Sequence, residues 1–542
     1  MEARAPGQRF TRAAGIALPL FSLRGEHDVG VGEIFDLIPF IDWLDRWHQR
    51  IVQLLPISET APGESSPYNT LSAFAIDPAY ISADRVVDVR RSADAQTWLQ
   101  SAAVRQHVRR WRRARRRNRR GVYHFKIRLL EFGFREFDAQ AADSERGRTF
   151  EQFRRANAWW LDDYALFRAL KERRRWTSWE TWPADLQQRA PDTVRRVAAE
   201  LQSRVRFLQY VQWIAAEQWC EVRAHARKRG VLLKGDLPFV CGRDSADVWA
   251  HQELFDLRSS AGAPPDAFSA TGQAWGLPLY DWGALRRSQY EWWRQRARQA
   301  RALYDVFRVD HVVGIYRTYA IAVGKGGTSG FVPADEADQL RQGRDVLAAV
   351  LEEAGARSAV VAEDLGNVPD WVRASLTQQG IPGYKILRWE TCDGGYIDTH
   401  AYSPASVATS GTHDTETLKV WWEALAEDAR LAAARSFNWG VARLGTDDPA
   451  LPWTPEIHLA LLRALYEAGS VLTILPIQDV FGWRERINTP ATTGGANWTY
   501  RLPVEVGKLD QVREIRERME TIRGMIDASG RWSTQRSSIE PP

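Results

Sequence analysis

The sequence predicts an α/β fold, a closed (β/α)8 or TIM barrel with helical insertions, on the basis of two observations. First, eight short runs rich in Val, Ile and Leu recur along the chain, and such continuous apolar runs are typical of parallel strands buried on both faces. Second, amphipathic segments of helical periodicity lie between several of these runs, as at 34–47, 291–303 and 344–353. An open doubly wound sheet is the alternative, but no GxGxxG motif follows an early strand.

The eight expected strands lie at 15–22, 51–57, 231–240, 306–313, 358–365, 384–389, 406–414 and 472–479. Several of them carry an acidic residue where the apolar run gives way, namely Asp236, Asp310, Glu363, Asp414 and Asp479. In a barrel of this kind the chemistry takes place at the carboxyl ends of the strands. These positions are therefore the first candidates for a functional site.

One segment interrupts the alternation of strands and helices. From 84 to 218 the pattern is helical and rich in Arg and Trp, which predicts a helical insertion subdomain after the second strand. The chain then needs only one barrel domain over 1–542, since single barrels with insertions can reach this length. A charged helix is expected at about 508–526, and the tail of Ser, Pro and Arg at 527–542 is expected to be frayed.

The composition excludes several classes of protein. With 44% hydrophobic and 26% charged residues, the chain has an ordinary globular composition rather than a disordered one. The three cysteines are widely spaced and form no CxxC motif, which disfavours a disulfide framework and fits a reducing cytoplasm. No apolar run reaches about 18 residues, and the run at 15–21 lacks a small-residue cleavage site, so neither a membrane span nor a signal peptide is expected.

The segment 109–120 holds nine arginines in twelve residues. Such a run could contact nucleic-acid phosphates or an acidic face of a neighbouring subunit. We favour a solvated face of the helical insertion, because 68 acidic residues nearly balance the 73 basic ones and no nucleic-acid-binding signature accompanies the run. No nucleic-acid partner is therefore expected, and the sequence leaves the oligomeric state open.

Three strand ends carry residues that could do chemistry. Arg308 and Asp310 are two positions apart, so both side chains enter the barrel mouth together, and the arginine is expected to lower the pKa of Asp310, as a nucleophile requires. Glu363 ends a second buried strand, where desolvation can keep a carboxyl protonated, as a general acid requires. His413 and Asp414 end a third strand.

Each of these acids taken alone is more often a helix cap or one half of an ion pair. Together they fit a retaining glycosidase, which needs two carboxyl groups about 5–5.5 Å apart, and opposed strands of one barrel mouth can supply that geometry. The 25 Trp residues add flat faces on which sugar rings can stack. The residues alone therefore favour a carbohydrate-active barrel.

Other active-site patterns are absent or incomplete. The glycine-rich stretch 324–330 lacks the spacing of a P-loop, so a mobile loop is expected there rather than a phosphate site. No HExxH motif, no carboxylate-rich calcium loop and no GxSxG elbow occurs. No metal and no cofactor is therefore expected.

Nine motifs follow one another along the chain in the same order as in a known family. They are Ser66-Pro-Tyr-Asn69, Ser72-Ala-Phe-Ala75, Lys234-Gly-Asp-Leu-Pro238, the segment 244–251, the segment 264–280, Arg308-Val-Asp-His311, Ala362-Glu-Asp-Leu-Gly366, Gly411-Thr-His-Asp414 and Gly494-Gly-Ala-Asn-Trp498. In these motifs the chain resembles the amylomaltases, or 4-α-glucanotransferases, of glycoside hydrolase family 77, which are related to the α-amylases. The resemblance implies transfer of α-1,4-glucan segments to the 4-hydroxyl of an acceptor glucan through a covalent glucosyl-enzyme. Its partners would be α-1,4-glucans and maltooligosaccharides.

Carried over residue by residue, the resemblance implies Asp310 as nucleophile, Glu363 as acid/base and Asp414 as the group that stabilises the transition state. It also implies a set of substrate-binding or supporting residues: Tyr68, Asp236, Gln273, Trp275, Arg308, His413 and Asn497. The chain departs from the family pattern at Glu416, where an aspartate is usual, at Asp77, where an asparagine is expected, and across 84–218, which matches only loosely. Two alternatives remain, an α-1,4-glucan hydrolase and a non-catalytic glucan-binding barrel, although a binding barrel would not need the three acids.

Overall fold

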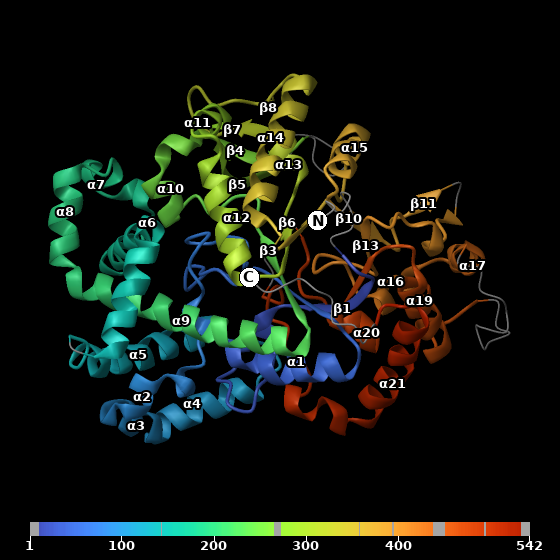
Figure 1. The fold of residues 1–542 in the computed structure, drawn as a ribbon, viewed down its shortest axis with the longest axis horizontal. Coiled ribbons are helices and arrows are strands. Elements are labelled where there is room, and N and C mark those ends of the chain that lie inside the picture. The colour runs from blue at the N-terminus through green and yellow to red at the C-terminus, as the bar shows by residue number, and fades with distance from the viewer. Residues whose placement is uncertain are drawn as a thin grey trace.

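The computed structural model describes residues 10–142, 144–264, 273–356, 358–392, 395–436, 450–490, 492 and 495–532. Its centre is an eight-stranded parallel sheet in which the strands follow chain order around a barrel (Figure 1). The barrel strands are β1 (Ala13–Leu18), β2 (Ile51–Leu54), β3 (Leu232–Leu237), β6 (Val306–Val309), β9 (Ala359–Ala362), β10 (Gly383–Ile386), β13 (Ser406–Thr409) and β14 (Leu472–Pro476). Each of them overlaps one of the eight predicted runs.

The barrel closes where β9 meets β10. The backbone N–H of Ala362 donates to the carbonyl of Pro382 at 2.9 Å, and the N–H of Tyr384 donates to the Asp364 carboxylate at 2.7 Å. Every other neighbouring pair of barrel strands is joined by a parallel ladder. The predicted (β/α)8 barrel is therefore confirmed.

The barrel interior has an apolar floor and a polar mouth. Side chains from seven strands form one buried cluster: Ala13, Ile51, Val306, Ala359, Val361, Tyr384, Val407, Leu472 and Ile474. Side chains two positions apart on a strand point the same way. Arg308 therefore points to the same side as Val306, and Glu363 to the same side as Val361, but each lies nearer the mouth of the barrel. The alternation along each strand thus places the charged residues above the core.

Helices surround the barrel (Figure 1). In α1 the buried residues Leu37, Phe40, Ile41 and Leu44 recur every three or four positions, which is why this segment packs as an amphipathic helix. The helices outside the region between β2 and β3 are α1 (Leu37–Arg46), α10 (Ala246–Ala250), α11 (Trp282–Arg287), α12 (Glu291–Leu303), α13 (Val313–Tyr316), α14 (Glu336–Ala354), α15 (Asp370–Gln378), α16 (Leu418–Ala424), α17 (Glu427–Ser436), α19 (Pro455–Glu467), α20 (Ile477–Phe481) and α21 (Arg513–Ala528).

Between β2 and β3 the chain forms a helical region beside the barrel. Its helices are α2 (Val87–Arg91), α3 (Ala93–Gln100), α4 (Ala102–Arg113), α5 (Arg119–Asp138), α6 (Glu145–Arg173), α7 (Ala184–Gln187), α8 (Pro191–Glu200) and α9 (Gln202–Arg229). Glu59, in the loop that follows β2, is fully buried and accepts hydrogen bonds from Tyr123 at 3.0 Å and Arg168 at 2.9 Å. A buried charged pair therefore anchors this barrel loop to the helical region.

A second sheet, which the sequence did not lead us to expect, lies beside the barrel. It is antiparallel, in the order β5-β4-β7-β8, and consists of β4 (Phe255–Ala263), β5 (Gln273–Tyr280), β7 (Thr318–Ala322) and β8 (Gly330–Val332). The glycine-rich stretch 324–330 joins β7 to β8. A short hairpin, β11 (Thr391–Cys392) with β12 (Gly395–Tyr396), follows β10.

The end of the described chain is packed, contrary to our expectation of a frayed tail from 527 onward. The Arg531 side chain is 1% exposed and donates to the carbonyls of Ala468 at 2.7 Å and Ser470 at 2.9 Å. A buried guanidinium that bonds carbonyls holds residues 527–532 against the barrel, while 533–542 lie outside the described residues. Within the described ranges, no helix combines the length and the apolar character needed to cross a membrane.

Candidate active site

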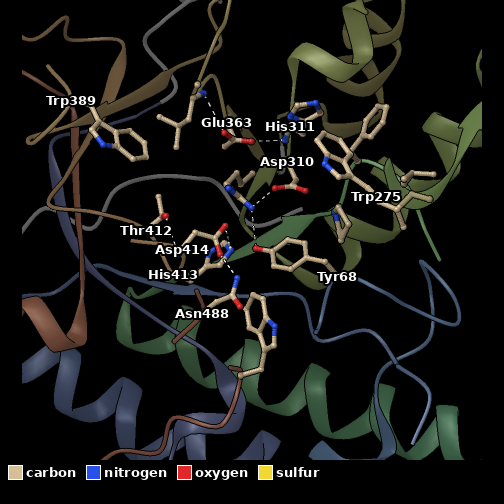
Figure 2. Close-up of a pocket in the computed structure, with 18 residues that line it drawn as sticks. Tyr68, Trp275, Asp310, His311, Glu363, Trp389, Thr412, His413, Asp414 and Asn488 are labelled. Carbon is tan, nitrogen blue, oxygen red and sulfur yellow. Dashed lines mark hydrogen bonds and ion pairs between the residues drawn. The ribbon is translucent and has the colours of Figure 1, made fainter. Parts of the chain in front are cut away.

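A pocket of about 440 Å³ lies at the carboxyl ends of the barrel strands, a size typical of ligand sites. The predicted residues that line it are Tyr68, Trp275, Arg308, Asp310, Glu363, His413 and Asp414. Figure 2 shows the carboxylates of Asp310 and Glu363 facing the cavity from one side and Asp414 from another. The structure thus brings the three predicted catalytic acids to one cavity.

Asp310 stands at the end of a buried hydrogen-bond network. Asp236 on β3 and Arg308 on β6 are cross-strand partners, and the carboxylate of Asp236 accepts two hydrogen bonds of 2.8 Å from the guanidinium. The same Arg308 nitrogen Nη2 donates to Asp310 and to the Tyr68 hydroxyl, which itself donates to Asp236 at 2.7 Å. Arg308 and Asp236 are therefore held rigidly below the pocket, and Asp310 is oriented by them.

The protonation of Asp310 differs from our expectation. Burial raises the pKa of this carboxyl and outweighs the opposing charge of Arg308, and the like charge of Asp236 adds to the rise, so that the pKa stands at about 6. The prediction that Arg308 would bring the pKa of Asp310 below its ordinary value is therefore wrong, because the net shift is upward. Asp310 is still mainly ionised at neutral pH.

Glu363 comes from the neighbouring strand rather than an opposed one. Its backbone N–H donates to the carbonyl of Val309, and its carboxylate accepts from the backbone N–H of His311 at 2.7 Å and of Leu365 at 3.2 Å. His311 adopts a φ of 44°, in the left-handed region that non-glycine residues rarely enter, and this turn aims its N–H at the carboxylate. The two carboxyl groups therefore follow adjacent strands, β6 and β9, and not opposed strands of the barrel mouth.

Burial raises the pKa of Glu363 to about 8; Arg308 opposes the rise and the negative charge of Asp310 adds to it. The neighbouring charge of Asp310 disfavours a second carboxylate in the same site. At neutral pH the pocket therefore combines an ionised Asp310 with a protonated Glu363.

Asp414, after β13, is held in its charged form. Burial alone would raise its pKa, but the His413 imidazole 3.3 Å away and the amide of Asn488, which donates at 2.6 Å, prevail and lower the pKa to about 2. Asn488 lines the pocket and its backbone N–H also donates to the carbonyl of His413. Sequence reasoning missed this residue, because nothing near it in the chain marks it as a partner of Asp414.

Aromatic side chains line the pocket on three sides. Tyr68 and His413 stack with ring centroids 5.2 Å apart, and the Trp498 ring lies 5.9 Å from Tyr68 and 5.6 Å from His413. Figure 2 shows Trp275 and Trp389 on opposite sides of the acids. These two rings are 39% and 51% exposed, which leaves open faces for a ligand. Trp275 was predicted to be such a surface, whereas Trp389 was not.

Two of the remaining predicted residues, Asp236 and Asn497, are not among the residues that line the pocket. Asp236 is buried behind Arg308 and acts on the pocket through that arginine and Tyr68. Asn497 bonds within its own loop: its amide nitrogen donates to Thr492 and its oxygen accepts from the N–H of Thr489. Gln273 begins β5, and its side chain lies outside the described part of the structure. Among the described residues, no three His, Cys, Asp or Glu side chains are grouped so that they could hold a metal ion.

Comparison with known proteins identifies the family. A sequence profile of the 4-alpha-glucanotransferases matches residues 18–506. The chain belongs to the 4-alpha-glucanotransferase family. It is an enzyme with 4-alpha-glucanotransferase activity, and the resemblance drawn from the nine motifs is confirmed.

Relatives match this 4-alpha-glucanotransferase over nearly its whole length. The 4-alpha-glucanotransferase of Chlamydia pneumoniae is 32% identical over 511 residues, covering 90% of this chain and 91% of that protein. That of Thermus thermophilus is 32% identical over 531 residues, covering 94% of this chain and 99% of its own. The solved amylomaltase from Streptococcus agalactiae in complex with acarbose has a TM-score of 0.79 at 25% identity, and covers 96% of this chain and 100% of that one.

Proposed function

We propose that the enzyme moves α-1,4-glucan segments by a retaining double displacement in which Asp310, Glu363 and Asp414 have separate roles. The observation that carries the proposal is that one cavity holds three carboxyl groups whose pKa values lie near 2, 6 and 8. Carboxyl groups whose environments separate their pKa values can act as acid, nucleophile and charge stabiliser at the same pH.

In the first step Glu363 gives its proton to the glycosidic oxygen while the Asp310 carboxylate attacks the anomeric carbon. The bond between that carbon and oxygen breaks, and the reducing-end part of the donor glucan leaves with a free 4-hydroxyl, while the other part stays bound to the enzyme. A glucosyl ester forms on Asp310. Asp414, ionised and fixed by Asn488, stabilises the positive charge that develops on the sugar ring.

In the second step Glu363, now a carboxylate, takes the proton from the 4-hydroxyl of an acceptor glucan. That oxygen attacks the anomeric carbon, the ester breaks, and Asp310 returns to its carboxylate form. Two displacements restore the starting configuration, which the reaction requires, because an α-linkage is broken and an α-linkage is made. A single displacement would invert it.

The proposed ligands are α-1,4-glucans and maltooligosaccharides. The stacked pair Tyr68 and His413, with Trp498 beside it, would enclose the reacting sugar, and the exposed faces of Trp275 and Trp389 would carry sugars on either side. The similar amylomaltase from Streptococcus agalactiae was solved with acarbose, which supports an oligosaccharide in this pocket.

We infer that residues 1–542 form one catalytic unit and that the enzyme acts in the cytoplasm. The buried bonds of Glu59 to Tyr123 and Arg168 support a single unit, because they fasten the helical region 84–218 to a loop of the barrel. Cys220 and Cys241 are free thiols, which supports a reducing compartment.

Incubation with maltotriose tests the function. Transfer produces a ladder of longer and shorter maltodextrins with little rise in total reducing ends, whereas a hydrolase raises reducing ends steadily and a non-catalytic barrel produces neither. Asp310→Asn and Glu363→Gln should each reduce turnover by about 10³-fold or more with the fold intact. Asp370→Asn, which changes an exposed carboxylate on α15, is the matched control. Near-normal turnover in either active-site variant would contradict the assigned roles.

A further inference from the structure

Two arginines of the segment 109–120 are buried. Arg117 and Arg119 are each 9% exposed, whereas Arg115 and Arg116 beside them are exposed. A buried guanidinium must find acceptors for its five N–H groups. The expected solvated face therefore does not describe these two residues, and their partners show what they hold in place.

Arg117 joins two segments that lie far apart in the sequence. Its Nη2 donates to the carbonyl of Ser65 at 2.9 Å, and its Nε donates to the carbonyl of Trp498. Its backbone N–H donates to the carbonyl of Thr499 at 3.1 Å, and its guanidinium carbon lies 3.7 Å from the centre of the Phe21 ring. One side chain thus fixes the loop after β2 to the segment around Trp498.

These two segments supply two of the rings that line the pocket. Tyr68 lies three residues after Ser65, and Trp498 is itself a partner of Arg117. Trp498 adopts a φ of 59°, in the left-handed region that is strained for a residue with a Cβ. Its backbone is held by two bonds, from its own N–H to the carbonyl of Ile487 at 2.8 Å and from Arg117 to its carbonyl.

The contact is reciprocal. Arg501, three residues beyond Trp498 and 5% exposed, donates from Nη1 to the carbonyls of Trp111, Arg112 and Ala114 at 3.0, 3.1 and 3.0 Å. These carbonyls belong to the last turn of α4 and its cap, where intrahelical donors are lacking. Each side therefore contributes a buried arginine to the carbonyls of the other.

We propose that Arg117 is a positioning residue for the glucan site, which holds Tyr68 and Trp498 against His413 before substrate arrives. The proposal rests on the proposed function, since it requires a sugar in this pocket. A side chain that fixes the walls of a pocket lowers the ordering cost of binding without touching the ligand. The helical region thereby takes part in glucan binding through the barrel loops rather than by direct contact.

The test measures the affinity for acarbose by calorimetry and the kinetics of maltotriose disproportionation in Arg117→Lys and Arg117→Met. Lysine keeps the charge but lacks the fixed fork that reaches two carbonyls in different segments. Both variants should weaken acarbose binding and raise the KM for maltotriose by about tenfold, because small displacements of a site are costly. The matched control, Arg115→Met, removes an exposed arginine from the same turn and should behave as the wild type.

A double-mutant cycle with Trp498→Ala separates positioning from general stability. Because Arg117 also holds the segment that carries Tyr68, Arg117→Met should still weaken acarbose binding once the ring is gone, but by clearly less than in the wild-type background. An unchanged acarbose affinity in Arg117→Lys, or a full additional loss in the Trp498→Ala background, would overturn the proposal. If Arg117→Met fails to fold, Arg117→Lys replaces it both in the affinity measurement and in the double-mutant cycle. Failure of the wild type to disproportionate maltotriose would instead refute the proposed function.

Discussion

The pH dependence of kcat/KM offers a direct test of the division of roles between Asp310 and Glu363. The first step requires an ionised Asp310 and a protonated Glu363 in the same free enzyme molecule. Burial raises the pKa of Asp310 to about 6 and that of Glu363 to about 8. Activity should therefore rise as pH passes 6, when Asp310 ionises, and fall as pH passes 8, when Glu363 loses its proton.

The magnitude follows from these two values. With a pKa of about 8, about 90% of Glu363 holds its proton at pH 7, against about 0.3% for a carboxyl at the ordinary value of 4.5. With a pKa of about 6, about 90% of Asp310 is ionised at the same pH. The productive form then makes up about 80% of the enzyme at pH 7 and about tenfold less at pH 5 and at pH 9.

The assay is the initial rate of glucose release from maltotriose well below KM, at constant ionic strength, between about pH 4.5 and 9.5. Enzyme held at each pH and returned to neutrality must regain full activity, which excludes unfolding as the cause of either limb. Asp370→Asn should keep the same profile, because its carboxylate is exposed. An alkaline limb near pH 5, or none at all, would show that Glu363 is not the buried acid described here.

Three further predictions concern the same pocket. In Asp236→Asn the acid limb should move to lower pH, because the like charge that raises the pKa of Asp310 is removed while Arg308 remains; an upward move would contradict this account. In Asn488→Ala, loss of the amide that holds the Asp414 carboxylate in place should reduce kcat/KM by about 10- to 100-fold, and a value near that of the wild type would contradict this role. Glu363→Gln should become more stable relative to the wild type as pH rises from about 4.5 to 8, by at most about 1.4 kcal/mol per pH unit in chemical unfolding. In this window the folded wild type keeps a proton that its unfolded chain releases, so the wild type alone loses stability as pH rises. Equal stability of the two proteins across that window would refute this.

The barrel was predictable because its signal is local. Strands buried on both faces need continuous apolar runs, and such runs are visible in any window of the sequence. The second sheet escaped prediction because the buried stretch of β4, 259–262, consists of serine, alanine and glycine, so no run of Val, Ile and Leu marks it. The burial of Arg117 escaped for a different reason: its acceptors lie 52 and 381 positions away, and an arginine-rich run looks solvated until those carbonyls are brought to it.

The positions of the three carboxyl groups proposed to be catalytic were predictable as well, but their protonation was not, and Arg308 shows why. Strand periodicity alone places Arg308 and Asp310 on one face, and from that neighbourhood we expected a lowered pKa for Asp310. In the fold the guanidinium gives two of its donors to Asp236, a cross-strand partner 72 positions away, and only one to Asp310. The charge of one arginine is thus shared between two buried carboxylates that repel each other, so burial prevails at Asp310. A short window of the sequence contains Arg308 and Asp310 but not Asp236, whose charge determines how they ionise. Asp236 meets them only when β3 and β6 lie side by side in the fold.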